Sequence, residues 1–121
     1  MKFKTDKIEG EFFKIQPKLR LMLAEADWFL WKRKGEAFVT SLFREPEEQR
    51  ALYQAGQASS TQSVHMYGRG ADLRVTEPEK DIEDLANYLN EKYPYDPGRP
   101  KFSTALIHEG TRKHLHIQVK E

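Results

Sequence analysis

Hydrophobic and polar positions repeat along this chain with two different periods, and each period predicts one kind of element. Between residues 16 and 35, apolar residues recur at intervals of three and four, which is typical of one buried face of a helix. The residues of this face are Leu19, Met22, Leu23, Ala26 and Leu30. Leu21 and Trp28 fall on the opposite face, so we expect the helix either to bury two sides or to end early, near Asp27.

Two more helices are predicted further along the chain. The segment 44–56 has Pro46 near its start, where proline suits the first turn of a helix. The segment 76–93 is the clearest helix, because Thr76 and Glu79 fit a capping box and a buried stripe follows them. That stripe consists of Ile82, Leu85, Ala86 and Leu89.

Four short segments have the composition or the alternation of strands, namely 37–43, 71–75, 102–109 and 114–120. The last two are joined by a turn around Gly110 and so resemble a hairpin. The predicted order is helix, strand, helix, strand, helix, strand, strand. This order favours an α+β domain, with a small, mainly antiparallel sheet flanked by helices, over a doubly wound parallel sheet.

The last predicted strand, 114–120, sorts its side chains by type onto two faces, because alternate residues of a strand point to opposite sides. One face is apolar and is predicted to lie on the core: Leu115, Ile117 and Val119. The other face is polar: His114, His116 and Gln118. Two imidazoles and an amide are therefore expected together on a rigid element.

Composition narrows the classes of function. The 121 residues are expected to form a single domain, residues 1–121, and the net charge of +1 does not indicate nucleic acid as a partner. No segment has the apolar run of a signal peptide or a membrane span. We therefore expect a chain synthesised in the cytoplasm, without an integral membrane segment, and a monomer by default. Because cysteine is absent, any metal site must use histidine and carboxylate ligands, which suit zinc.

The stretch SVHMYGRGADLR, residues 63–74, sets His65 and Asp72 around a Gly-Arg-Gly. Together with His114 or His116 of the last strand, they would supply the three protein ligands that catalytic zinc commonly takes. The remaining position of such a site holds water, and zinc lowers the pKa of that water to about 7. The spacing is thus compatible with a hydrolytic zinc site.

Other residues would complete this chemistry. Gly68 and Gly70 would give the loop the backbone freedom to bend. Glu109, at the end of the neighbouring strand, is the best-placed general base, and Arg44, after a strand, suits the capture of a carboxylate. The structural alternatives stay open: the histidine pair would then be a polar sheet face, and Asp72 a turn residue bonded to its own backbone.

The stretch SVHMYGRGADL resembles the Ser-x-His-x-x-Gly-x-Ala-x-Asp signature of D-alanyl-D-alanine carboxypeptidases and L-alanyl-D-glutamate endopeptidases. This superfamily includes phage endolysins and shares its fold with the hedgehog signalling domain. HLHIQV is similar to its terminal strand, and FVTSLFREPEEQRALY is similar to its strand-arginine-loop-helix segment, so the resemblance runs from about Phe38 to Val119. It implies that His65, Asp72 and His116 bind zinc.

The resemblance also implies a peptide-binding site that contains Arg44, Gln49 and Ser63. One position departs from the signature, since Gly70 stands where the family has alanine.

The catalytic acid departs further. Many members place a carboxylate three residues before the terminal ligand, and this chain has Lys113 there. Hedgehog-type relatives carry the acid further upstream, a pattern that Glu109 approximates. We expect Glu109 to be the catalytic carboxylate and His114 to help stabilise the transition state or orient the site.

The sequence therefore predicts a zinc metallopeptidase that cleaves a bond in the stem peptide of peptidoglycan, as a carboxypeptidase or an endopeptidase. The lack of a secretion signal favours a phage or prophage lysis protein that reaches the cell wall after phage-type release. Two alternatives remain: a zinc-binding module of the same fold without turnover, and a metal-free scaffold or phage structural protein.

Overall fold

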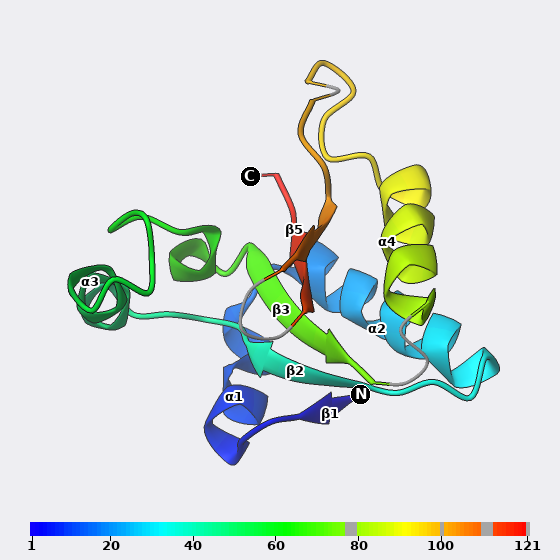
Figure 1. Ribbon diagram of the computed structural model, residues 1–121, viewed down its shortest axis with the longest axis horizontal. Helices are drawn as coiled ribbons and strands as arrows, with labels where there is room; N and C mark the ends of the chain where they lie inside the picture. The colour runs from blue at the N-terminus through cyan, green and yellow to red at the C-terminus, as the bar shows by residue number, and fades with distance from the viewer. Residues whose placement is uncertain (77–79, 100, 110–112, 121) are drawn as a thin grey trace.

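A five-stranded sheet with the order β1-β2-β3-β5-β4 organises the chain in the computed structural model (Figure 1). The structure describes residues 1–76, 80–99, 101–109 and 113–120. Its strands are β1 (Lys2–Phe3), β2 (Ala37–Ser41), β3 (Gly70–Val75), β4 (Ala105–His108) and β5 (His114–Gln118). The pair β1–β2 is parallel, and the three other pairs are antiparallel. The predicted α+β fold with a mainly antiparallel sheet is confirmed.

The described residues form four α-helices and two short 3-10 turns. These are α1 (Asp6–Gly10), η1 (Glu11–Lys14), α2 (Pro17–Lys32), α3 (Pro46–Gln54), η2 (Val64–Tyr67) and α4 (Lys80–Lys92). Helices α2 and α4 pack beside each other on one face of the sheet, while α3 lies away from it on a long excursion between β2 and β3 (Figure 1). The predicted helix stripes on α2 and α4 are buried in one cluster with Leu73, Leu115 and Ile117 of the sheet.

Both outcomes expected for the helix over residues 16–35 were wrong. Helix α2 continues to Lys32, and its second face is not buried: Leu21 is 52% exposed and Trp28 is 55% exposed. The indole of Trp28 stacks on that of Trp31 at 5.1 Å, and the Lys32 ammonium lies 5.6 Å from the Trp28 ring. These contacts within the helix cover part of the apolar surface, so the helix does not need a second buried side.

The first 15 residues hold structure that the hydrophobic periodicity did not reveal. Strand β1 has only two residues and adds to the edge of β2. Helix α1 has five residues. Thr5 caps it by accepting a hydrogen bond from the Ile8 N–H at its Oγ1, at 3.2 Å. Such short elements are too brief for a period to show in the sequence.

The strands and helices differ from the predicted ones mainly at their ends. Strand β2 ends at Ser41, after an irregularity in its pairing with β3 between Val39 and Ser41, rather than at residue 43. The predicted capping box of the last helix includes Glu79, which lies outside the described residues. Thr76 itself donates its hydroxyl to the Glu36 carbonyl at 3.0 Å.

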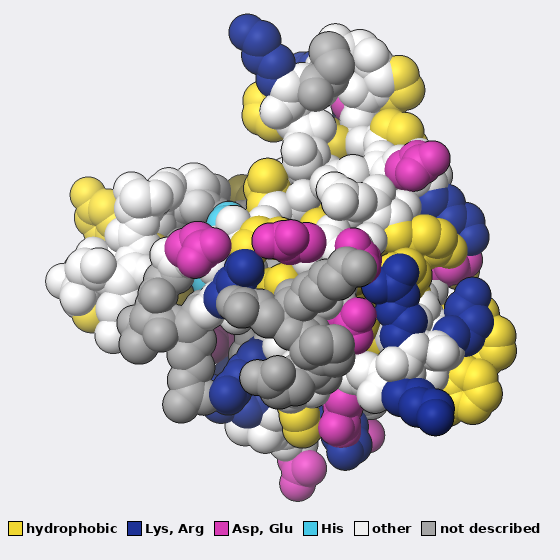
Figure 2. All heavy atoms as spheres, turned by 45° about the vertical axis from the view of Figure 1, so that its right-hand side comes forward, with side chains coloured by type: hydrophobic (Ala, Val, Ile, Leu, Met, Phe, Trp, Pro, Cys, Tyr) yellow, Lys and Arg dark blue, Asp and Glu magenta, His cyan; other side chains and the backbone are white. Residues whose placement is uncertain are grey.

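The second face of the sheet carries polar side chains. Alternation along the strands puts Phe38 of β2, Asp72 and Arg74 of β3, and His114 and His116 of β5 opposite the core. Neither α2 nor α4 covers this face. Figure 2 shows the molecule turned by 45°, with acidic and basic side chains interspersed rather than gathered by sign. In the part of the chain that the structure describes, no helix has the length and apolarity needed to cross a bilayer.

Gly68 offers a test of how the turn before β3 is held. Its φ is +68°, and an added Cβ would lie 2.7 Å from the Lys14 carbonyl oxygen and 3.1 Å from Ile15 Cα. Gly56 has a similar φ of +76° but open space around it. Gly56→Ala should therefore cost about 1–2 kcal/mol of folding free energy through backbone strain alone. Gly68→Ala should cost clearly more, because η1 and the turn must separate. Urea unfolding of both variants measures the difference, and equal losses would contradict this account.

Candidate metal centre

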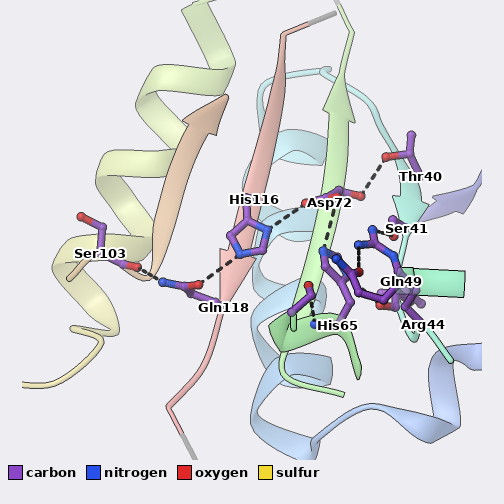
Figure 3. A network of polar contacts seen from close by, with 11 residues as sticks. Thr40, Ser41, Arg44, Gln49, His65, Asp72, Ser103, His116 and Gln118 are labelled. Atoms are coloured by element: carbon purple, nitrogen blue, oxygen red, sulfur yellow. Dashed lines mark hydrogen bonds and ion pairs between the residues drawn. The ribbon is translucent and has the colours of Figure 1, made fainter. Parts of the chain in front are cut away.

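The pairing of β3 with β5 brings the first two members of the site together. Asp72 and His116 are partners in the antiparallel register and point to the open face of the sheet. The Nδ1 atom of His116 lies 2.9 Å from Oδ1 of Asp72. From the turn before β3, His65 reaches the same carboxylate, with its Nε2 3.3 Å from Oδ2 (Figure 3). One ligand atom from each of the three residues lies within 4.8 Å of the others.

The local sequence explains why His65 lies beside the Asp72 carboxylate. Ser63 caps the 3-10 turn η2 by accepting the His65 N–H at its Oγ, at 3.2 Å, and Gly68 ends the turn with positive φ. Gly70 is the first residue of β3 and lies in close contact with its neighbours, since an added Cβ would lie 2.5 Å from Cγ2 of Val64. The two glycines thus serve different needs, one a left-handed backbone and the other a close approach.

A main-chain carbonyl fixes the orientation of the His65 ring. Nδ1 of His65 lies 2.7 Å from the carbonyl oxygen of Leu42, and a carbonyl can only accept a hydrogen bond. Nδ1 therefore carries a hydrogen, so that in the neutral ring the lone pair is on Nε2, the atom that faces Asp72. This is the arrangement in which metal-ligating histidines commonly occur.

The electrostatics of the three side chains are compatible with a bound cation. His65 and His116 are 3% and 9% exposed, so the imidazoles and the carboxylate meet largely away from water. Burial alone would raise the pKa of Asp72, but hydrogen bonds with His116 and His65 outweigh it and hold this pKa well below its usual range. The carboxylate is thus ionised, and Nε2 of His65 and Nδ1 of His116 face it at short distance. A proton or a metal ion between them makes this arrangement favourable, so the donor set fits a metal such as zinc.

A second polar network lies beside His65 and contains two residues predicted to bind substrate. The Arg44 guanidinium donates to Oε1 of Gln49 at 2.7 Å and to Oγ of Ser41 at 3.0 Å (Figure 3). Buried Gln49 in turn donates to the Ser60 carbonyl at 2.9 Å. The Arg44 N–H also bonds the His65 carbonyl at 3.1 Å. The structure thus joins Arg44 and Gln49 to the metal-ligand candidate His65.

The two residues predicted to be catalytic lie apart from the three convergent ligands. The Glu109 side chain is 78% exposed, and its carboxylate lies 3.9 Å from the Lys113 ammonium. His114 instead lines a groove of about 710 Å³ on the open sheet face, next to Asp72. The other residues that line this groove are Phe3, Lys4, Phe38, Thr40, Arg74 and Lys113. The catalytic roles of Glu109 and His114 stay predictions.

Sequence reasoning missed several residues of the site. The exposed His108 stacks on the His116 ring at 5.5 Å and meets the His114 ring edge-on at 5.2 Å. Partial desolvation of the ring, and after it the electrostatic interaction with His116 and His114, lower the pKa of His108. Alternation along the last strand had placed Gln118 beside His116 but gave it no role. The Leu42 carbonyl had no signal at all, because a backbone group is the same in every residue.

A comparison with solved structures finds a similar fold, whereas the comparisons with family models and with curated proteins find no match. Among solved structures, the crystal structure of the L-Ala D-Glu endopeptidase ChiX from Serratia marcescens is similar, with a TM-score of 0.56. The likeness covers 98% of this chain and 90% of that one, at 15% sequence identity. The chain therefore shares the α+β fold of that endopeptidase.

The histidine pair of β5 gives a direct test of the metal centre. His116→Ala should abolish stoichiometric binding of zinc, because it removes a ligand from a three-residue set. His114→Ala is the matched control on the same strand face and should retain the metal. Elemental mass spectrometry after zinc loading and desalting measures both. Loss of zinc in His114→Ala with retention in His116→Ala would show that the ligand set is wrong.

Proposed function

We propose that this chain is a zinc-dependent peptidase that hydrolyses a bond in the stem peptide of peptidoglycan. The observation that supports this most is the convergence of His65, Asp72 and His116 at the open face of the sheet. The fold, similar to that of an L-Ala D-Glu endopeptidase, and the resemblance of the segment 63–73 to the superfamily signature point to the same class.

The proposed ligand atoms follow from the hydrogen bonds of each ring. His65 would bind through Nε2 and His116 through Nδ1, while Asp72 would supply a carboxylate oxygen. Zinc with three protein ligands lowers the pKa of a coordinated water to about 7, which supplies a nucleophile at neutral pH. Burial of the imidazoles would raise the affinity of the site for the ion.

The substrate would lie in the groove beside Asp72 and His114. Arg44 does not line this groove but is bonded to His65, and it would bind a carboxylate at the other side of the centre. Ser41 and Gln49 accept two of the five N–H donors of Arg44 and fix the plane of the guanidinium. The remaining donors suit a planar carboxylate. In this arrangement Gln49 acts by orienting Arg44. Ser63 accepts the His65 N–H and keeps its own hydroxyl hydrogen to donate to a substrate carbonyl.

Glu109 is our proposal for proton transfer. It would take the proton of the attacking nucleophile and pass it to the leaving amine. Its ion pair with Lys113 is long and exposed, and such pairs stabilise little, so the carboxylate is free to turn toward the groove. His114, which lines the groove, would donate to the oxygen on which negative charge develops.

A second candidate function is supported by the exposed position of Glu109. In that case the chain is a zinc-stabilised module that binds stem peptides without hydrolysing them. For either function, we propose that the chain acts as a monomer, is made in the cytoplasm and reaches the cell wall through phage-type release.

Digestion of purified sacculi separates the two functions. With zinc present, we expect the wild type to release peptide fragments with new termini, detected by mass spectrometry, and a chelator to stop the reaction. Glu109→Ala should retain zinc and lose about 10²–10⁴-fold in rate, the usual contribution of an acid-base group. Glu83→Ala is the matched control, because Glu83 is exposed and also pairs with Lys113, at 3.8 Å. Zinc binding with no release of fragments would favour the binding module.

Arg44→Lys tests the carboxylate site. Lysine keeps the positive charge but cannot make two parallel hydrogen bonds. We expect kcat/KM on soluble stem peptides to fall about 10–100-fold, from the loss of a charged hydrogen bond, with zinc content unchanged. Arg50→Lys on the exposed side of α3 should have no effect. An unchanged kcat/KM in Arg44→Lys would remove Arg44 from the substrate site.

A further inference from the structure

One side-chain amide lies behind the candidate ligand His116. Nε2 of His116 is 3.1 Å from Oε1 of Gln118, on the side of the ring opposite Asp72. Nε2 of Gln118 is 2.9 Å from the Ser103 carbonyl oxygen. Figure 3 shows the resulting chain of contacts, from Ser103 through Gln118 and His116 to Asp72.

The Ser103 carbonyl decides which way the amide points. A carbonyl oxygen has no hydrogen to give, so the group of Gln118 that faces it must be the NH₂. The oxygen of the same amide then faces Nε2 of His116. Because that oxygen also only accepts, Nε2 must carry the hydrogen. In the neutral ring the lone pair is then on Nδ1, the atom that faces Asp72.

The Ser103 carbonyl, where this series of contacts begins, lies in a segment that is itself held in place. The segment that precedes β4 is fixed to β5 by the bond from the Gln118 N–H to the Thr104 carbonyl, at 2.8 Å. It is fixed to α4 by Asn90, whose side chain bonds both the N–H and the carbonyl of Ala105, at 2.8 and 2.9 Å. The Thr104 hydroxyl donates to the Tyr93 carbonyl. The orientation of Gln118 is therefore set by the packed helix α4.

The two candidate histidine ligands are held in opposite tautomers by different means. The Leu42 carbonyl keeps the hydrogen of His65 on Nδ1, so that Nε2 faces the site. Gln118 keeps the hydrogen of His116 on Nε2, so that Nδ1 faces the site. The group that orients His65 is a backbone carbonyl, which no substitution removes directly. The group that orients His116 is a side chain, which a substitution can remove.

From this we propose that Gln118 is a positioning residue of the metal centre, which fixes the tautomer and ring orientation of His116 through the relay from Ser103. The inference rests on the metal centre of the proposed function, but it concerns metal affinity rather than turnover. Partners of this kind behind a ligating histidine commonly contribute 10–100-fold to metal affinity.

Two substitutions of similar size separate this role from simple packing. Gln118→Met fills the same space without an acceptor, so His116 should gain the Nδ1–H tautomer and zinc affinity should fall about 10–100-fold. Gln118→Glu loses the donor to the Ser103 carbonyl but keeps an acceptor toward Nε2, so the Nε2–H tautomer should persist and zinc affinity should fall less than in Gln118→Met. Gln16→Met, at an exposed position before α2, controls for the substitution itself.

Both readouts are independent of peptidase activity. Long-range ¹H–¹⁵N correlation spectra at fixed pH report the tautomer of His116, and competition with a chromophoric chelator reports the zinc dissociation constant. Equal affinity in wild type and Gln118→Met, with Nε2–H retained, would overturn the inference and leave the proposed function standing. Equal losses in Gln118→Met and Gln118→Glu would overturn it in favour of packing.

The proposed function is tested separately by the digestion of sacculi. Inactive wild type with the expected difference between the two Gln118 variants would overturn the peptidase and support the role of Gln118. A wild type that binds no zinc would overturn both.

Discussion

The register between β3 and β5 is the constraint on which the rest of the structure depends. It pairs Asp72 with His116 on the open face and Leu73 with Leu115 on the core face. Because side chains alternate along a strand, a shift of one residue would move the polar set into the core and the apolar set into water. The hydrophobic burial of Leu73 and Leu115, both fully enclosed, therefore also fixes the relative position of the carboxylate and the imidazole. In this fold, core packing and site geometry are two results of the same pairing.

Around the Asp72 carboxylate, the protein supplies rigid partners on two sides. On the side of β2, the Leu42 carbonyl orients His65, and Arg44 is tied to His65 through the main chain. On the side of β4, Gln118 orients His116. Each of these contacts satisfies a polar group that would otherwise be buried at a cost, which limits the rings to one orientation each. In the proposed metal centre, this restricted freedom would favour tight binding of an ion, because little ordering is left to do.

The open face has different properties from the buried centre. The groove beside Asp72 and His114 is lined by residues of β1, β2, β3 and β5, most of them half-buried. The loop between β2 and β3 carries α3 and the polar network of Arg44 and Gln49, away from the main core (Figure 1). Strands β3 and β5 thus hold Asp72 and His116, while the excursion between β2 and β3 supplies His65 and the proposed contacts to substrate. Loops positioned by a rigid scaffold often carry the residues that contact a ligand.

The sequence alone determined the core faces of the two long helices and the last strand, because burial follows a regular period there. It also determined the candidate set His65, Asp72 and His116, since the spacing of these residue types resembles a known signature. Only the tertiary structure decided that α2 continues with an exposed face, that residues 2–14 form β1, α1 and η1, and that Glu109 lies exposed. It alone revealed the carbonyls of Leu42 and Ser103 behind the two rings. The reason is physical: a period records which side chains avoid water, whereas a backbone carbonyl is common to all residues and acquires its role only when folding brings it to a ring.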